Sequence, residues 1–146
     1  MSPKFILCSV CFTLFISSCD KPVTEEGSKM DFLTASAWVI QKGEERDNND
    51  PWIDVFPFQA ACIKDDKWIF KSNFSLEYND AANPCSPNIP NQVLDEVTWS
   101  FADNESKLII DGITYLIEQL DANSLIIFTS TTTGGGVSEA RITFGH

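Results

Sequence analysis

The chain has 146 residues with 21 acidic and 10 basic side chains, which gives a formal net charge of −11 at pH 7. This balance excludes a nucleic-acid-binding protein, because a phosphate backbone is bound by clustered lysine and arginine side chains. The only histidine is the terminal His146, so histidine-dependent catalytic triads are excluded. We therefore expect a protein that is not an enzyme and uses no cofactor.

The N-terminal segment predicts a bacterial lipoprotein signal peptide over residues 1–18. One basic residue, Lys4, precedes an apolar run at 5–15, and these 11 residues are too few to cross a bilayer, which takes about 20. Residues 16–19, Ile-Ser-Ser-Cys, resemble the lipobox of an aliphatic residue, two small residues and cysteine. We expect cleavage before Cys19 and acylation of that cysteine, with palmitate among its acyl chains. An ordinary cleaved secretory signal and a retained membrane anchor are the alternatives.

The signal also predicts where the chain resides. We expect a mature protein held by its lipid at a membrane of the bacterial cell envelope, the outer membrane in particular, with its domain outside the cytoplasm. Cleavage leaves 146 − 18 = 128 residues, a single-domain length. Only Lys4 is lost among the charged residues, so 9 basic and 21 acidic side chains remain, a net charge of −12. An acidic surface of this kind attracts cationic protein partners.

Two regions follow the signal peptide. Residues 19–31 are polar, with one proline, one glycine and no sustained apolar period, and they predict a lipidated N-terminus followed by a flexible tether. The folded domain is expected at 32–146. From residue 36 onward the apolar side chains mostly follow a period of two, which is typical of strands with one buried face.

The alternation assigns side chains to faces of the predicted strands. Phe74, Leu76 and Tyr78 share one face of a strand at 73–79. In the strand at 96–102, Trp99 is expected to be buried because it alternates with polar residues.

Turn chemistry sets the connections between strands. Asp111-Gly112 predicts a type I′ hairpin turn with Ile110 opposite Ile113, because both central residues of such a turn need a positive φ. Successive antiparallel neighbours with one apolar face close most simply into an up-and-down barrel, so the predicted fold is all-β, with eight antiparallel strands. The strands are expected at residues 36–42, 66–71, 73–79, 96–102, 107–110, 113–119, 124–130 and 137–144.

Several short segments together resemble the small lipocalin-like lipoproteins of bacteria. They are residues 33–38, 61–66, 68–70, 97–101 and the late hairpin 108–117, with Cys85 in the loop that follows residues 68–79. The resemblance implies a meander barrel, often with a binding cavity, and leaves the ligand open. Where lipocalins often have Gly-x-Trp at the first strand, this chain has Ser-Ala-Trp at 36–38. Of that motif it therefore shares only the tryptophan.

The cysteines predict one disulfide bond. Cys8 and Cys11 leave with the signal peptide and Cys19 is blocked by lipid, which leaves Cys62 and Cys85. An even pair in an oxidising compartment is expected to be bonded. Two buried free thiols are the alternative.

Two acidic segments supply the carboxylate oxygens that a metal site or acid–base catalysis would need. Residues 47–50, with Asp54 beyond them, supply oxygen ligands but lack the alternating spacing, central glycine and closing glutamate of an EF-hand loop. Adjacent carboxylates such as Asp65-Asp66 are typical of a solvated face. We expect no metal site and no catalytic residues.

Residues 51–58 combine five large apolar residues with two prolines and predict a lid over one barrel end. The lid either plugs the core or lines the mouth of a ligand site. The candidate ligand-binding residues are the aromatic side chains of this lid and of the barrel wall: Trp52, Phe56, Phe58, Trp68, Phe70, Tyr78, Trp99 and Tyr115.

These features predict a lipid-anchored envelope protein that binds a small, largely apolar molecule, since apolar concave cavities are the usual small-ligand sites. The alternative is a protein-binding or inhibitory lipoprotein with a filled barrel, for example one that binds a cationic envelope hydrolase. The partners expected from sequence are therefore the membrane, through the N-terminal lipid, and either an apolar ligand or a cationic protein.

Overall fold

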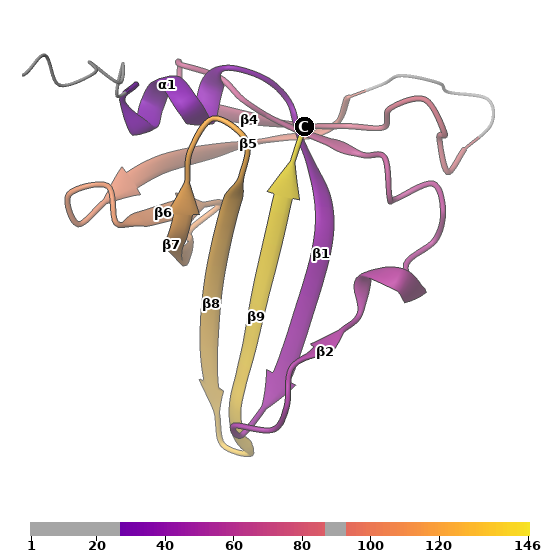
Figure 1. The fold of residues 1–146 in the computed structure, drawn as a ribbon, viewed down its shortest axis with the longest axis vertical. Helices are drawn as coiled ribbons and strands as arrows, with labels where there is room; N and C mark the ends of the chain where they lie inside the picture. The colour runs from indigo at the N-terminus through magenta and orange to yellow at the C-terminus, as the bar shows by residue number, and fades with distance from the viewer. Residues whose placement is uncertain (1–26, 87–92) are drawn as a thin grey trace, which may run out of the picture.

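The computed structural model describes residues 27–86 and 93–146. Here the chain forms one antiparallel sheet that closes into a barrel, and the predicted all-β, eight-stranded architecture is confirmed (Figure 1). The predicted signal peptide, Cys19 and the first part of the predicted tether lie outside these residues. The barrel strands are β1 (Trp38–Asp47), β3 (Lys67–Phe70), β4 (Ser75–Asn79), β5 (Val93–Ala102), β6 (Lys107–Ile110), β7 (Ile113–Leu120), β8 (Leu125–Thr133) and β9 (Gly136–Gly145), and a short strand β2 (Ile53–Asp54) is added at the edge of β1.

Pairing of the first and last long strands closes the barrel. The β1–β9 register runs from Val39 opposite Gly145 to Asp47 opposite Ser138. On the other side of β9, β8 pairs with β7 only as far as Phe128. The rest of β8 and the parts of β9 and β1 beside it therefore project beyond the shorter strands as a three-stranded extension, seen at the bottom of Figure 1.

The predicted late hairpin is confirmed. Asp111 and Gly112 have φ values of +48° and +77°, as a type I′ turn requires. Ile110 lies opposite Ile113 in the β6–β7 register. The turn and the register were therefore both readable from the dipeptide and its apolar neighbours.

Phe74 is a correction to the predicted strand at 73–79. Its φ is +66°, and its N–H donates to the Lys71 carbonyl at 2.9 Å, so Phe74 belongs to the turn and β4 begins after it. The turn leaves Phe74 48% exposed, although its ring still packs on Trp99 at a centroid distance of 5.3 Å. A tight connection between β3 and β4 needs a left-handed residue, a requirement that hydrophobic alternation does not reveal.

Side chains fill the barrel interior. The inward faces of the strands contribute large aromatic and aliphatic residues, each at most 3% exposed. Trp99 is buried as predicted, while Thr98 on the opposite face is exposed. The fully packed cluster consists of Leu33, Trp38, Phe70, Leu76, Trp99, Leu108, Ile110, Leu125, Ile127 and Phe144.

A short helix, α1 (Lys29–Thr34), begins inside the predicted tether. Ser28 and Asp31 form a capping box, in which the Ser28 hydroxyl accepts from the Asp31 N–H and the Asp31 carboxylate accepts from the Ser28 N–H. These bonds satisfy backbone donors that a helix start leaves free. The folded part therefore starts upstream of the predicted boundary at residue 32.

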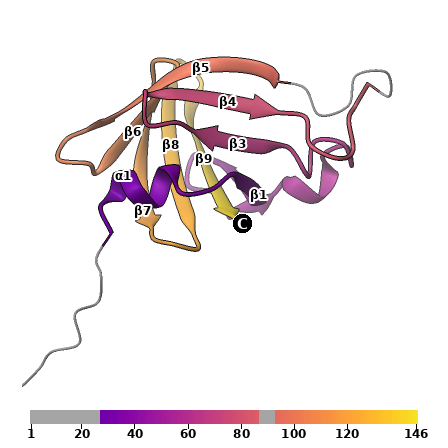
Figure 2. The same cartoon turned by 90° about the horizontal axis from the view of Figure 1, so that it is seen from above.

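Helix α1 covers one end of the barrel (Figure 2). It contacts β3 and β7, which lie far apart in the strand order. Leu33 is fully buried, and its carbonyl accepts a 2.9 Å hydrogen bond from Trp38 Nε1. In residues 27–86 and 93–146 no helix has the length and apolar character needed to cross a membrane.

Candidate functional site

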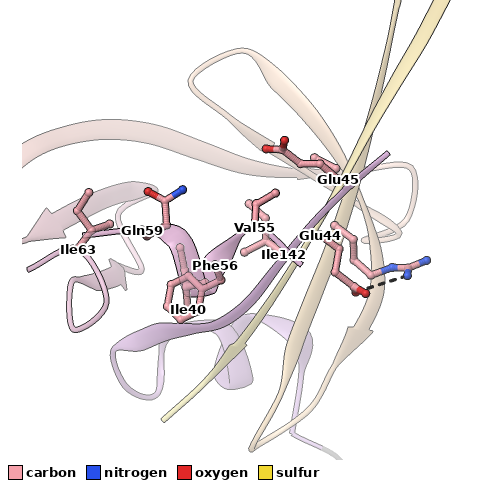
Figure 3. Close-up of a pocket in the computed structure, with 11 residues that line it drawn as sticks. Ile40, Glu44, Glu45, Val55, Phe56, Gln59, Ile63 and Ile142 are labelled. Carbon is pink, nitrogen blue, oxygen red and sulfur yellow. Dashed lines mark ion pairs between the residues drawn. The ribbon is translucent and has the colours of Figure 1, made fainter. Parts of the chain in front are cut away.

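An apolar pocket lies between the sheet formed by β1 and β9 and the segment that follows β2 (Figure 3). Its volume is about 180 Å³. We call it the β1–β9 pocket. It is lined by Ile40, Gly43, Glu44, Glu45, Val55, Phe56, Gln59, Ile63, Ala140, Arg141 and Ile142.

Backbone pairing positions the segment that closes the pocket. Strand β2 pairs with β1, with Asp54 opposite Glu44, and the Val55 N–H donates to the Gly43 carbonyl at 2.7 Å. The Asp54 carboxylate accepts from the Phe56 N–H at 3.1 Å, which starts the 3-10 turn Phe56–Phe58. Val55 and Phe56 are thereby held against the sheet.

Gly43 leaves space in the floor of this pocket. A Cβ atom at this position would lie 3.8 Å from both Phe56 Cβ and Val55 Cγ2, which is ordinary van der Waals contact. A Cβ atom is therefore accommodated at Gly43, and the further atoms of a larger side chain would take up space beside Val55 and Phe56 in the pocket.

The chemistry of the pocket suits binding. Ile40 and Ile142 pack against the barrel core and continue its apolar surface into the pocket. At the rim Glu44 pairs with Arg141 at 3.7 Å (Figure 3). No histidine or cysteine is among the lining residues, and the two glutamates are the lining carboxylates. The arrangement can desolvate an apolar group but lacks a paired nucleophile and base.

The aromatic residues predicted to line a ligand cavity in the barrel instead build its core. Phe70 and Trp99 are buried and meet edge to face at 5.5 Å. Trp68 and Tyr78 meet in the same way at 4.8 Å and, with Tyr115, pack half-buried against the cluster. Burial raises the pKa of the Tyr78 phenol to about 12 and raises the pKa of Tyr115 as well. An eight-stranded barrel is narrow enough for such side chains to fill it.

The predicted lid at 51–58 runs along the edge of β1, whereas α1 covers the barrel end. Of its three candidate residues, Phe56 lines the β1–β9 pocket and Phe58 is 84% exposed nearby. Trp52 lies elsewhere, on the outer face of the sheet. Of the eight candidate ligand residues, Phe56 is therefore the one that lines the β1–β9 pocket.

Trp52 is held between two guanidinium groups. Arg46 and Arg141 each lie 4.5 Å from its ring centroid, and Phe128 meets it edge-on at 6.3 Å. Arg46 also pairs with Glu139. Cation–π contacts contribute about 0.5 to 2 kcal/mol each, depending on burial, so Trp52 fastens the segment before β2 to the outside of the barrel. Charges alternating along β1 and β9 are the sequence signal for this cluster, and sequence reasoning overlooked it.

The predicted disulfide between Cys62 and Cys85 is present, with a Cα–Cα distance of 5.0 Å. It ties the loop before β3 to the loop after β4. Ile63, adjacent to Cys62, lines the β1–β9 pocket. The disulfide therefore helps to hold one wall of the pocket in place.

The chain matches no protein-family model, and no curated protein is significantly similar to it. What it binds is therefore inferred from the barrel, the pocket and the sequence signals, and the resemblance to lipocalin-like lipoproteins stays a prediction.

Proposed function

We propose that this chain is a lipid-anchored binding protein of the bacterial cell envelope that takes a small, largely apolar group into the β1–β9 pocket. The apolar lining of this pocket is the observation that supports the proposal most. The anchor and the location are supported by the lipobox-like residues 16–19. Removal of apolar ligand surface from water supplies the driving force, at about 25 cal/mol per Å².

The pocket volume limits the ligand. Whole drug-sized molecules occupy pockets of about 300 to 1,000 Å³, and this pocket has about 180 Å³. It fits a single ring or a short branched chain, with the rest of the ligand outside. The barrel interior is excluded as the site in this proposal because aromatic side chains occupy it.

Charge at the rim favours neutral or cationic ligands. Glu44 pairs with Lys42 at 2.7 Å and with Arg141 at 3.7 Å, whereas Glu45 forms no ion pair within the described residues. The chain as a whole is acidic, at −11. Free fatty acids would bring a carboxylate towards these negative charges, so we expect neutral apolar compounds to bind more tightly than their anionic analogues.

Binding of the neutral fluorophore N-phenyl-1-naphthylamine tests the proposal. The purified protein should enhance its fluorescence saturably, and Gly43→Leu should weaken binding at least about tenfold by filling the pocket, a loss of about 1.4 kcal/mol. Gly134→Leu is the matched control, because a Cβ at Gly134 meets no atom within 4 Å. Thermal unfolding verifies that both variants fold. Equal binding by all three proteins, or no binding by the unsubstituted one, contradicts the proposal.

A protein partner is the second candidate function. The filled interior favours it, and so do two apolar side chains beside the pocket, Phe58 at 84% and Ile53 at 61% exposed, since exposed apolar residues in a group mark interaction surfaces. The acidic charge points to a cationic partner. Lysozyme, a cationic hydrolase, is the probe: binding should weaken with salt and with Phe58→Ser, and should persist in Ile113→Ser, a matched exposed position on the β6–β7 hairpin. Absence of salt-sensitive binding removes this candidate.

A further inference from the structure

Two further pockets continue the β1–β9 pocket towards the tip of the three-stranded extension. The nearer one, of about 220 Å³, shares Glu45 and Val55 with the β1–β9 pocket. The farther one, of about 260 Å³, shares Asp47 and Ser138 with the nearer one. The three pockets therefore adjoin one another, and we call this row of pockets the extension groove.

The alternation of side chains along β1 places the groove on one face of the sheet. Gly43, Glu45 and Asp47 share this face, and in Figure 3 the side chains of Glu45 and Glu44 leave opposite sides of β1. Ile142, opposite Gly43, packs against the barrel core, so the face continues the barrel interior. At about 3.3 Å per residue, Glu45 lies about 7 Å and Asp47 about 13 Å along the strand from Gly43.

The lining changes from apolar to acidic along the groove. Aliphatic and aromatic side chains line most of the β1–β9 pocket. Glu45 lies at the junction with the second pocket, where Asp47 and Asp50 add two more carboxylates beside Ile53 and Val55. The third pocket is lined mostly by polar residues and glycines. One end of the groove can therefore desolvate an apolar group, while the rest presents negative charge.

Within the described residues, no ion pair neutralises the carboxylates of Glu45, Asp47 and Asp50. Arg46 is the basic residue among those that line the second pocket. Its guanidinium pairs with Glu139, and alternation along β1 directs it to the face opposite to Glu45. A cationic group of a ligand would therefore meet carboxylates that the protein has not paired.

A closed turn fixes the far end of the groove. The Asn48 N–H donates to the Val137 carbonyl at 2.8 Å, and Asn48 Oδ1 accepts from the Val137 N–H at 2.9 Å. The Asn48 side chain takes up the space beside Gly136 and leaves no room there for a Cβ atom. Strands β1 and β9 are therefore held together up to the tip, so the backbone positions that carry the carboxylates are fixed relative to the β1–β9 pocket.

We propose that the ligand is a cationic amphiphile, which refines the proposed function and rests on it. Its apolar group enters the β1–β9 pocket and its amine lies beside Glu45 and Asp47. An ammonium group about 7 to 13 Å from the apolar group reaches these carboxylates, given the spacing along β1. A concave acidic site attracts a cation more strongly than isolated surface charges do, because low-dielectric walls focus the field.

Three phenylbutyl compounds test the charge of the ligand. At neutral pH 4-phenylbutylamine is a cation, 4-phenylbutan-1-ol is neutral and 4-phenylbutyrate is an anion. Isoleucine methyl NMR gives a dissociation constant for each from Ile142, and Ile53 reports on the second pocket. At about 20 mM NaCl the amine should bind at least about fivefold more tightly than the alcohol, and the anion most weakly. The amine's advantage should shrink at about 500 mM NaCl, because salt screens the charges.

Glu45→Gln tests the position of the charge, because this carboxylate is shared by two pockets. The variant should reduce the amine's advantage over the alcohol to about twofold or less. Glu105→Gln is the matched control. It removes the same charge from an exposed residue of the β5–β6 turn that lines none of the three pockets, and it should keep the advantage. Asp47→Asn replaces Glu45→Gln if thermal unfolding shows that Glu45→Gln does not fold.

The outcomes distinguish a wrong ligand class from a wrong site. Saturable binding of the alcohol with no preference for the amine would overturn the cationic class and leave the proposed function intact. An equal loss of preference in Glu45→Gln and Glu105→Gln would trace it to net charge alone and would also overturn the proposal. Absence of saturable binding by both compounds at Ile142 would contradict the proposed function and the ligand class together.

Discussion

At the residue scale, Trp99 is held by close packing and by a hydrogen bond from its side chain. It is 2% exposed, its Nε1 donates to the Ser75 carbonyl at 3.0 Å, and its ring meets Phe70 and Phe101 edge to face. Such a side chain fills volume that no neighbour can fill when it is removed.

Substitutions at Trp99 and its neighbour therefore test which face is buried. Trp99→Ala should lower the free energy of unfolding by about 3 to 5 kcal/mol through lost transfer energy and a residual cavity. Thr98→Ala, on the exposed face, should lower it by about 0.5 kcal/mol or less. Urea denaturation of both variants measures the difference. A tolerated Trp99→Ala beside a disruptive Thr98→Ala would mean that the register of β5 is wrong.

Tyr78 gives a pH-dependent prediction. Burial, with smaller contributions from Tyr115, Asp111 and Asp95, raises its pKa from 10.0 to about 12 in the folded state. The unfolded phenol therefore ionises first, so the free energy of unfolding should fall as the pH rises from about 10 to about 12. In Tyr78→Phe this decline should be shallower. The chain has two tyrosines, so absorbance near 295 nm follows both phenols, and ionisation of folded protein complete by pH 10.5 would contradict the account.

At the scale of elements, the disulfide joins the loop before β3 to the loop after β4, and substitution of its two cysteines tests how much it stabilises the fold. Replacement of Cys62 and Cys85 by serine should lower the free energy of unfolding by about 2 to 5 kcal/mol. The disulfide joins residues 23 positions apart, and without it the unfolded chain has more conformational freedom. Mass analysis of the non-reduced protein should show two hydrogens fewer than the free thiols would carry. Rapid alkylation of both cysteines in envelope-derived protein is the contrary result.

The strands were predictable from sequence because their signals are local. Alternation locates them, and Asp111-Gly112 fixes a hairpin with its register. The turn conformation of Phe74 was not predicted, because a turn residue with positive φ can be as apolar as the strand beside it. Helix α1 was not predicted, because six residues are too few to show a helical period of apolar residues. The capping box of Ser28 and Asp31 was its one signal in the sequence.

The pocket could not be predicted for a different reason. It depends on β1 pairing with β9, where Gly43 lies opposite Ile142, and on the Val55 N–H reaching the Gly43 carbonyl. Contacts between residues so far apart in the chain leave no local pattern. The five barrel-wall aromatic residues among the proposed ligand contacts were correctly expected to face inwards, but alternation does not distinguish a filled interior from an open one.

At the scale of the whole molecule, the chain combines a filled barrel, a peripheral apolar pocket and a strong acidic charge with an N-terminal lipid anchor predicted from sequence. The predicted anchor would bring the protein to any ligand at the membrane surface. Three acyl chains on one cysteine would hold the protein at the membrane far more firmly than the marginal binding of a single chain.

Cys19→Ala tests the anchor. The variant should move from the membrane to the soluble fraction and lose labelling by a fatty-acid analogue, because the atom that carries the lipid is gone. Cys62→Ala, which leaves the predicted lipobox intact, should still be labelled. Label retained on the Cys19→Ala protein would contradict the lipoprotein prediction.

In the proposed function, an apolar ligand occupies the β1–β9 pocket and not the barrel interior. Isoleucine methyl NMR during titration with N-phenyl-1-naphthylamine tests it most directly, because isoleucines mark both places. Occupation of the pocket should give saturable shifts for Ile40, Ile63 and Ile142, which line it, with little change at Ile110 and Ile127 in the core. Shifts concentrated at Ile110 and Ile127, or no saturable shift at any of the five, would contradict it.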